Sequence, residues 1–270
     1  MAASMRRIVT GRSAVIAAVL AAVAASGARL ALHAQGARPN RLIEQYKAGK
    51  PAIVHKEWAW INMENSWDPE RLRTVLTGLK QEPLTPVLRV PAGGAEGPSR
   101  FIQIALDLGI ANLVIPKIAT AEEARRLVTA MREQKAAAGQ AAAYWGVSQQ
   151  EYARKAALWP LNPNGELVAI VMIESKAAVD NIEEILRVPG LGGVFIGPYD
   201  LGNSLGVGPP RDGKIPPATE AAIQKVRGAC QAFKQIICGI AGMPISQKDL
   251  RVQEGWNMIQ FLEPGVPASR

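Results

Sequence analysis

The sequence predicts a single (β/α)8 barrel, and three observations favour this fold class. The chain has 270 residues, of which 48% are hydrophobic, which suits one domain of the roughly 250 residues that such barrels need. Short apolar runs alternate with helical patterns along most of the chain, as in a parallel sheet. Eight of these runs are continuously apolar, as expected of strands buried on both faces, and this number favours closure into a barrel. The alternative is an open doubly wound sheet, but the sequence has neither a GxGxxG nor a GxxxxGK[ST] motif.

The predicted elements follow one another in a regular order after a short amphipathic helix over residues 41–50. Thr120 is a plausible N-cap, with Glu122 and Glu123 in the first turn of its helix, where carboxylates favour the helix dipole. Residues 140–166 are rich in Trp, Pro, Asn and Gly and predict a long excursion over one end of the fold. The predicted strands are 52–54, 59–63, 86–90, 112–116, 167–174, 193–198, 236–240 and 257–262, and the later helices are 68–80, 99–109, 120–138, 178–188, 218–234 and 247–255.

Two places depart from a complete barrel. Only four residues separate the first two predicted strands, too few for a crossover helix, so the first βα unit is expected to be truncated. Eight residues follow the last predicted strand, so no C-terminal helix is expected either. We expect an imperfectly closed barrel with exposed apolar surface, or a partner subunit of a homo-oligomer covering the gaps.

The N-terminus has the pattern of a secretory signal peptide. Arg6, Arg7 and Arg12 precede an apolar, Ala-rich stretch over residues 13–28 that is short for a membrane span. Cleavage after Ala34 would remove residues 1–34 and leave a barrel domain over residues 35–270 in the periplasm, without stable membrane insertion. The alternatives are an uncleaved membrane anchor or a cytoplasmic protein.

The chain has two cysteines, Cys230 and Cys238, too few for a disulfide scaffold. Export would permit a bond between them. However, the first falls in a helical pattern and the second in a strand pattern, which favours two buried thiols. Metal binding by this pair is not expected, because no histidine or third cysteine lies near them in the sequence.

The net charge is +8 and the isoelectric point is about 9.7. Part of the excess lies in the first forty residues, and the remainder is scattered, without a Lys/Arg run interleaved with aromatic residues. Nucleic-acid binding is therefore not predicted. Attraction of an anionic small-molecule substrate explains the positive charge equally well.

Charged residues stand at the ends of four predicted strands. Glu64 follows the second strand, Arg89 lies in the third, Glu174 ends the fifth, and Asp200 comes two residues after the sixth. The carboxyl ends of the strands form the catalytic face of such barrels. The sequence therefore predicts an active site at this end, and the alternative interpretation is a structural ion network at the barrel rim.

Two carboxylates on neighbouring strands, Glu174 and Asp200, indicate a site for a hard divalent cation. Mg²⁺ or Mn²⁺ is expected, and Co²⁺ is a further candidate. Arg89 would add a planar cation that suits a carboxylate or a developing enolate. Lys117 is the one lysine placed for a Schiff-base mechanism, but that mechanism would leave the paired carboxylates unused.

The segment VMIESKAAVDNIEEILRVPGLGGVFIGPYDLGNSLG resembles the metal-dependent class II aldolases of the HpcH/HpaI family, which includes relatives of the citrate lyase β subunit. PVLRVP and LDLGIANLVIPKIATAEEAR extend the resemblance over residues 59–262. The resemblance implies a (β/α)8 barrel that reversibly cleaves 4-hydroxy-2-oxo acids to pyruvate or a related 2-oxo acid and an aldehyde. It also implies that Glu174 and Asp200 bind the metal and that Arg89 stabilises the enolate or alkoxide.

The resemblance assigns further residues to substrate and proton transfer. The backbone of Gly197, Pro198 and Tyr199, beside Asp200, would hold the substrate carboxylate. Met172 stands where such enzymes often have a glutamine that contacts substrate. Asp107 would orient a histidine base and raise its basicity.

One departure from the family pattern concerns that base. The family has a Glu–His pair after the second strand, whereas this chain has Glu64 and Asn65, and an amide cannot accept and return a proton. His55 or a metal-bound water would have to replace the base. Three hypotheses follow: an active aldolase, a catalytically degenerate protein that binds a 2-oxo or dicarboxylic acid with a metal, and a structural protein with rim salt bridges.

Overall fold

The computed structural model describes residues 38–93, 97–133 and 138–262, and Pro39–Arg270 forms one compact unit. The predicted signal peptide, residues 1–34, and residues 263–270 lie outside the described residues. Across the described ranges, no helix is both long and apolar enough to cross a membrane.

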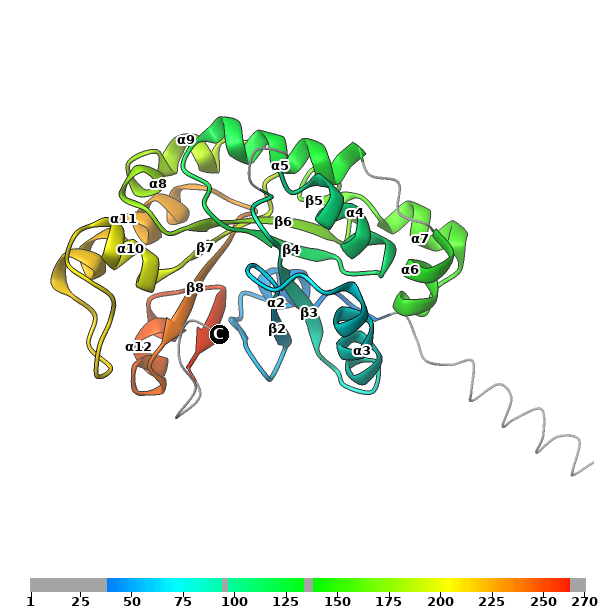
Figure 1. Ribbon diagram of the computed structural model, residues 1–270, viewed down its shortest axis with the longest axis horizontal. Helices are drawn as coiled ribbons and strands as arrows, with labels where there is room; N and C mark the ends of the chain where they lie inside the picture. The colour runs from blue at the N-terminus through cyan, green and yellow to red at the C-terminus, as the bar shows by residue number, and fades with distance from the viewer. Residues whose placement is uncertain (1–37, 94–96, 134–137, 263–270) are drawn as a thin grey trace, which may run out of the picture. The chain divides into compact units, whose positions relative to one another are not determined.

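The structure contains a nearly closed parallel barrel of eight strands, as predicted (Figure 1). The hydrogen-bonded order is β1-β9-β8-β7-β6-β4-β3-β2, and the short β5 is added beside β6. A parallel bridge between Val54 and Trp58 joins the two ends of this order. The strands are β1 (Ala52–Ile53), β2 (Trp58–Asn62), β3 (Thr85–Arg89), β4 (Asn112–Ile115), β5 (Leu158–Trp159), β6 (Leu167–Ile173), β7 (Gly193–Ile196), β8 (Ile237–Met243) and β9 (Met258–Phe261).

The first βα unit is truncated, as predicted. The chain passes from β1 to β2 through a turn over residues 55–57 instead of a crossover helix. His55 stands in this turn with φ of 60°, and its N–H donates to the carbonyl of Trp58 at 2.8 Å. This places His55 beside the start of β2, whereas Glu64 follows the end of that strand. His55 is therefore not positioned as the missing base.

Helices cover the outer face of the barrel, and Figure 1 shows α5, α8 and α9 lying over β4, β6 and β7. Three helices were not predicted: α6 and α7 lie in the excursion before β5, and α10 begins at Pro198, the last residue of the predicted strand 193–198. The helices are α2 (Arg41–Lys47), α3 (Pro69–Leu79), α4 (Ser99–Asp107), α5 (Ala121–Glu133), α6 (Ala138–Trp145), α7 (Gln149–Lys155), α8 (Lys176–Asp180), α9 (Ile182–Leu186), α10 (Pro198–Ser204), α11 (Pro217–Ala232) and α12 (Lys248–Gln253), with a 3₁₀ turn η2 (Ile245–Gln247).

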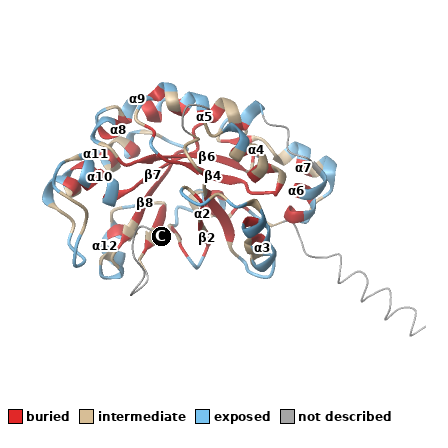
Figure 2. Cartoon of the chain, viewed as in Figure 1, coloured by how far each residue is buried: buried red, intermediate tan, exposed pale blue. Residues whose placement is uncertain are grey.

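Two hydrophobic cores hold the barrel together. The larger core fills the layer between strands and helices, and the smaller one fills the interior, where Trp58, Met172 and Phe195 are buried. Figure 2 shows the strands almost entirely buried. The helix α2 closes the amino end of the barrel, because Leu42 and Ile43 belong to the interior core.

Asn40 fixes α2 at this end. Its side-chain amide donates to Asn112 Oδ1 at the start of β4 and to the carbonyl of Glu166 before β6, both at 2.8 Å. Its Oδ1 accepts from the N–H of Leu42, which caps the helix N-terminus.

The expected exposed apolar surface is not found along β1 and β9, where Ala52, Met258, Ile259 and Phe261 are buried. Large hydrophobic side chains are exposed elsewhere among the described residues. They are Leu161, Tyr199, Val207, Ile245 and Leu250.

The prediction of two buried thiols was wrong, because Cys230 and Cys238 form a disulfide. Cys230 lies in the last turn of α11 and Cys238 is the second residue of β8. The short return from helix to strand brings their Cα atoms within 6.3 Å, a separation that a disulfide spans. The two cysteines do lie in different elements, a helix and a strand. However, consecutive elements of a barrel lie side by side, so this placement does not keep the two sulfur atoms apart.

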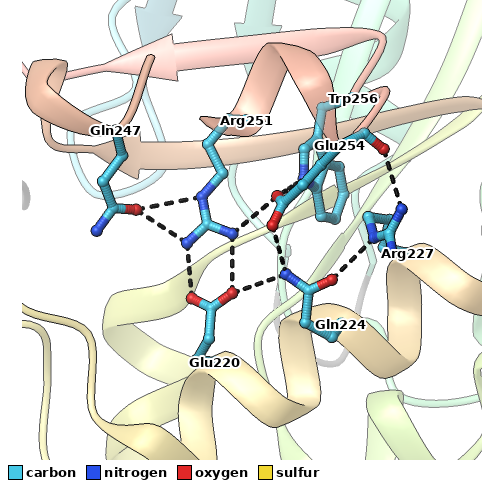
Figure 3. A network of polar contacts seen from close by, with 7 residues as sticks. All are labelled: Glu220, Gln224, Arg227, Gln247, Arg251, Glu254 and Trp256. Carbon is cyan, nitrogen blue, oxygen red and sulfur yellow. Dashed lines mark hydrogen bonds and ion pairs between the residues drawn. The ribbon is translucent and has the colours of Figure 1, made fainter. Parts of the chain in front are cut away.

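A buried polar network ties α11 to η2 and α12 (Figure 3). The side chain of Arg251 is only 1% exposed, and its guanidinium binds Glu220 at 2.6 and 2.9 Å. It also binds Glu254 at 2.9 Å and Gln247 at 2.9 and 3.2 Å. All three nitrogens of this buried cation are thereby hydrogen-bonded, and the segment between β8 and β9 is fixed to the preceding helix.

Candidate functional site

Three of the four predicted strand-end charges meet in one ion cluster. Nη2 of Arg89, the last residue of β3, lies 2.9 Å from Glu64 Oε2 and 3.1 Å from Glu174 Oε2. The side chains are 12%, 10% and 6% exposed for Arg89, Glu64 and Glu174, so solvent screens these charges weakly. The parallel register explains the meeting, because β3 and β6 both flank β4 and end at the same face.

Glu174 is held from two sides. Its Oε1 accepts the backbone N–H of Lys117 at 2.7 Å, and its Oε2 accepts from Arg89. Burial raises the pKa of this carboxyl above its usual value, and the nearby carboxylates of Asp200 and Glu64 raise it further. Arg89 and the Lys117 amide act in the opposite direction. The protein thus concentrates negative charge here and compensates it only in part, as a cation site requires.

Asp200 lies in the first turn of α10, which begins directly after β7, and it is within electrostatic range of Glu174. Its side chain is exposed, and its charge acts on Glu174. Gly197, just before α10, packs closely against Glu174 and Met172: a Cβ there would lie 3.3 Å from Glu174 Oε2 and 2.9 Å from the Cε of Met172, so this position has no room for a side chain. A larger residue at this position would collide with Met172 and press on the Glu174 carboxylate.

The donor set fits a hard divalent cation. Such cations bind to one or two carboxylates and complete their shell with water and substrate oxygens. Glu174 and Asp200 can supply this minimum. Within the described ranges, no three His, Cys, Asp or Glu side chains form a ready-made metal cage, so any ion held here would depend on non-protein ligands.

Only part of the backbone that was predicted to hold the substrate carboxylate is free to donate hydrogen bonds. The N–H of Gly197 donates to the carbonyl of Ile173 at 3.1 Å in the β6–β7 ladder, and Pro198 has no N–H. Of the three predicted residues, only Tyr199 offers a backbone donor, in the first turn of α10. Met172 is buried in the barrel interior, where the end of its side chain packs against Gly197.

Two predicted residues stand apart from the cluster. Asp107 ends α4, five residues before β4 begins, which puts it at the amino end of the barrel, opposite the site. There it accepts a hydrogen bond from Gln103 at 2.8 Å and raises the pKa of Tyr152. The role of orienting a base at the site is therefore not supported. Asn65 directly follows Glu64 in the chain, but it is exposed and is not part of the ion cluster.

Lys117 contributes in a way that the sequence did not reveal. Its φ of 61° is rare for a residue with a side chain. This conformation accompanies the backbone hydrogen bond to Glu174, while its ammonium lies 3.9 Å from Glu64 Oε1. The side chain is 69% exposed and lies at the mouth of the site. The desolvated position that a Schiff-base lysine needs is absent at this residue.

The comparisons with known proteins agree with this architecture. The model of the HpcH/HpaI aldolase/citrate lyase family matches residues 48–261. The chain belongs to this family. A family member from Burkholderia cenocepacia of known structure is 27% identical, with a TM-score of 0.63 and coverage of 82% of each chain. An HpcH/HpaI aldolase from Desulfitobacterium hafniense, 19% identical, shares the fold with a TM-score of 0.65 over 81% of this chain and 88% of its own.

A curated relative is also similar in sequence. The 2-keto-3-deoxy-L-rhamnonate aldolase of Escherichia coli is 40% identical over 147 residues, which is 51% of each chain. The match thus spans about half the length of that enzyme. The family to which the chain belongs is named for aldolases and citrate lyases.

Proposed function

We propose that this protein is a metal-dependent class II aldolase that reversibly cleaves 4-hydroxy-2-oxo acids to pyruvate or a related 2-oxo acid and an aldehyde. The main support is the buried convergence of Arg89, Glu64 and Glu174 at the carboxyl end of the barrel, with Asp200 within electrostatic range of Glu174. A relative named for the cleavage of a 2-keto-3-deoxy acid supports the same substrate class.

The roles of the residues follow from their positions. Glu174 and Asp200 would hold Mg²⁺, Mn²⁺ or Co²⁺, which supplies Lewis-acid stabilisation of negative charge on the 2-oxo group. Arg89 Nε is buried without a hydrogen-bond partner, so it can donate to a substrate oxygen while Nη2 remains on the two glutamates. The glycine at position 197 lets the start of α10 lie close to the Glu174 carboxylate.

Pyruvate release from a 4-hydroxy-2-oxo acid, measured with excess lactate dehydrogenase and NADH, tests the proposal. We expect activity that EDTA abolishes and Mn²⁺ restores, and a loss of at least about a hundredfold in Glu174→Gln. Glu183→Gln is the matched control, because Glu183 is an exposed glutamate paired with Arg187 on α9. Absence of pyruvate release with every divalent metal would exclude the aldolase.

A second function is favoured by one observation, the asparagine at position 65 where the family has its histidine base. A protein without that base would bind a 2-oxo or dicarboxylic acid with a divalent metal and turn it over slowly or not at all. Thermal stabilisation by oxalate plus Mg²⁺ without pyruvate release would identify this function. At one hundred times its dissociation constant, a ligand adds about 2.7 kcal/mol of stability.

We also propose that the protein is exported to the periplasm. The N-terminal sequence supports this location, and the disulfide between Cys230 and Cys238 supports it independently, because disulfides persist in oxidising compartments. Fractionation of cells expressing the full chain should place a shortened form in the periplasm. Recovery of the full-length chain in the cytoplasm with reduced cysteines would contradict export.

A further inference from the structure

We infer that Lys117 is the residue that balances the charge of the substrate carboxylate. This inference rests on the proposed function and gives Lys117 a role other than the Schiff-base role considered from the sequence. It starts from a lysine held in a left-handed backbone conformation at the carboxyl end of β4. A strained non-glycine residue persists where the surrounding structure fixes it, and such residues are concentrated at functional sites.

The contacts fix where the ammonium can be. The backbone N–H of Lys117 donates to Glu174 Oε1 at 2.7 Å, which holds the backbone of this residue at the site. Its Nζ lies 3.9 Å from Glu64 Oε1, on the same glutamate whose Oε2 binds Arg89. Glu64 is only 10% exposed, whereas Lys117 is 69% exposed, so the lysine is the more solvent-accessible charge of the two. We expect a substrate carboxylate that enters from solvent to be attracted by it.

The charge count gives the lysine its role. Arg89 and Lys117 face Glu64, Glu174 and Asp200, so the cluster carries a net charge of −1 when all five are ionised. A divalent cation changes this to +1, and one substrate carboxylate then brings it to zero. Without the lysine, the cluster and the cation would already sum to zero, and the carboxylate would enter a partly buried site as an uncompensated charge.

This role predicts effects of opposite sign for two ligands. Replacing the ammonium with an uncharged side chain of similar length removes repulsion toward a cation and attraction toward an anion. Lys117→Met should therefore bind Mn²⁺ about fivefold more tightly and oxamate about fivefold more weakly, the range expected for one exposed charge. Lys117→Arg keeps the charge and should change each affinity by less than about twofold.

The test is isothermal titration calorimetry of Mn²⁺ into the apo protein and of oxamate, an uncleavable pyruvate analogue, into the Mn²⁺-loaded protein. The control is Lys155→Met on α7, where Nζ lies 3.2 Å from Glu151, away from the site. Tighter Mn²⁺ and weaker oxamate in Lys117→Met alone would support the inference. Unchanged affinities, or weakening of both ligands, would overturn it while leaving the aldolase proposal intact. If the wild-type chain bound neither ligand, both proposals would fail.

Discussion

The buried cation Arg251 offers the sharpest test of how the last part of the barrel is held in place. In Arg251→Met the aliphatic length is kept, but the hydrogen bonds to Glu220, Glu254 and Gln247 disappear (Figure 3). Breaking a buried ion pair by removing one partner costs about 3–5 kcal/mol. We expect about 3 kcal/mol here, the lower end of that range, because Glu220 is 33% exposed and water can solvate it in the variant.

Urea unfolding followed by circular dichroism measures this loss, which corresponds to a fall in Tm of about 6–12 °C for a domain of this size. The control is Arg187→Met, which removes an exposed pair with Glu183 and should cost less than about 1 kcal/mol. Arg251 lowers the pKa of Glu220 below its usual value of 4.5. The stabilisation is therefore complete above that value, and the gap between wild type and variant should narrow as the pH falls below it. A loss no larger than that of the control would refute the reasoning.

Three further predictions concern other parts of the barrel. Replacing Cys230 and Cys238 together with alanine should cost about 2–3 kcal/mol in urea unfolding, because the bond closes a loop with a sequence separation of 8, and an unchanged midpoint would contradict this. Asn40→Ala should cost about 1–3 kcal/mol, since it removes a helix cap and leaves Asn112 without one buried partner; Asn164→Ala in an exposed turn is the control and should have little effect. Burial raises the pKa of Tyr152 to about 12, so its contribution to stability should be present below pH 10 and lost between pH 10 and 12. Ultraviolet titration between pH 10 and 11 should show the same number of ionising tyrosines in the wild type and in Tyr152→Phe, and one more ionising tyrosine in the wild type would contradict the raised pKa.

The eight barrel strands were predictable because each is a continuous apolar run, and such runs need no knowledge of tertiary contacts. Helix α10 was not, because Pro198, Gly202 and Asn203 are typical of loops, and only the proline at the first helical position signalled a helix start. The excursion before β5 contains α6 and α7, whose helical patterns are short and separated by Gly146.

At the site, the charged strand ends predicted which residues meet, since parallel strands end at one face. Arg89, Glu64 and Glu174 are in contact as their positions suggested. The hydrogen bond from Lys117 to Glu174 comes from the backbone N–H, which every residue but proline possesses. The side-chain type at this position therefore could not reveal it. Asp107 was assigned by family pattern alone, and its place at the end of α4 shows that a helix carries it to the opposite face.

The most direct test of the site is exchange of the methyl protons of pyruvate in D₂O, followed by proton NMR. This measurement isolates enolate formation from aldehyde chemistry, so it needs no knowledge of the acceptor. The account predicts exchange that requires Mn²⁺ or Mg²⁺, that disappears in Glu174→Gln and Asp200→Asn, and that persists in Glu183→Gln. Exchange that is as fast in Glu174→Gln as in the wild type would show that the carboxyl ends of β6 and β7 are not where the chemistry occurs.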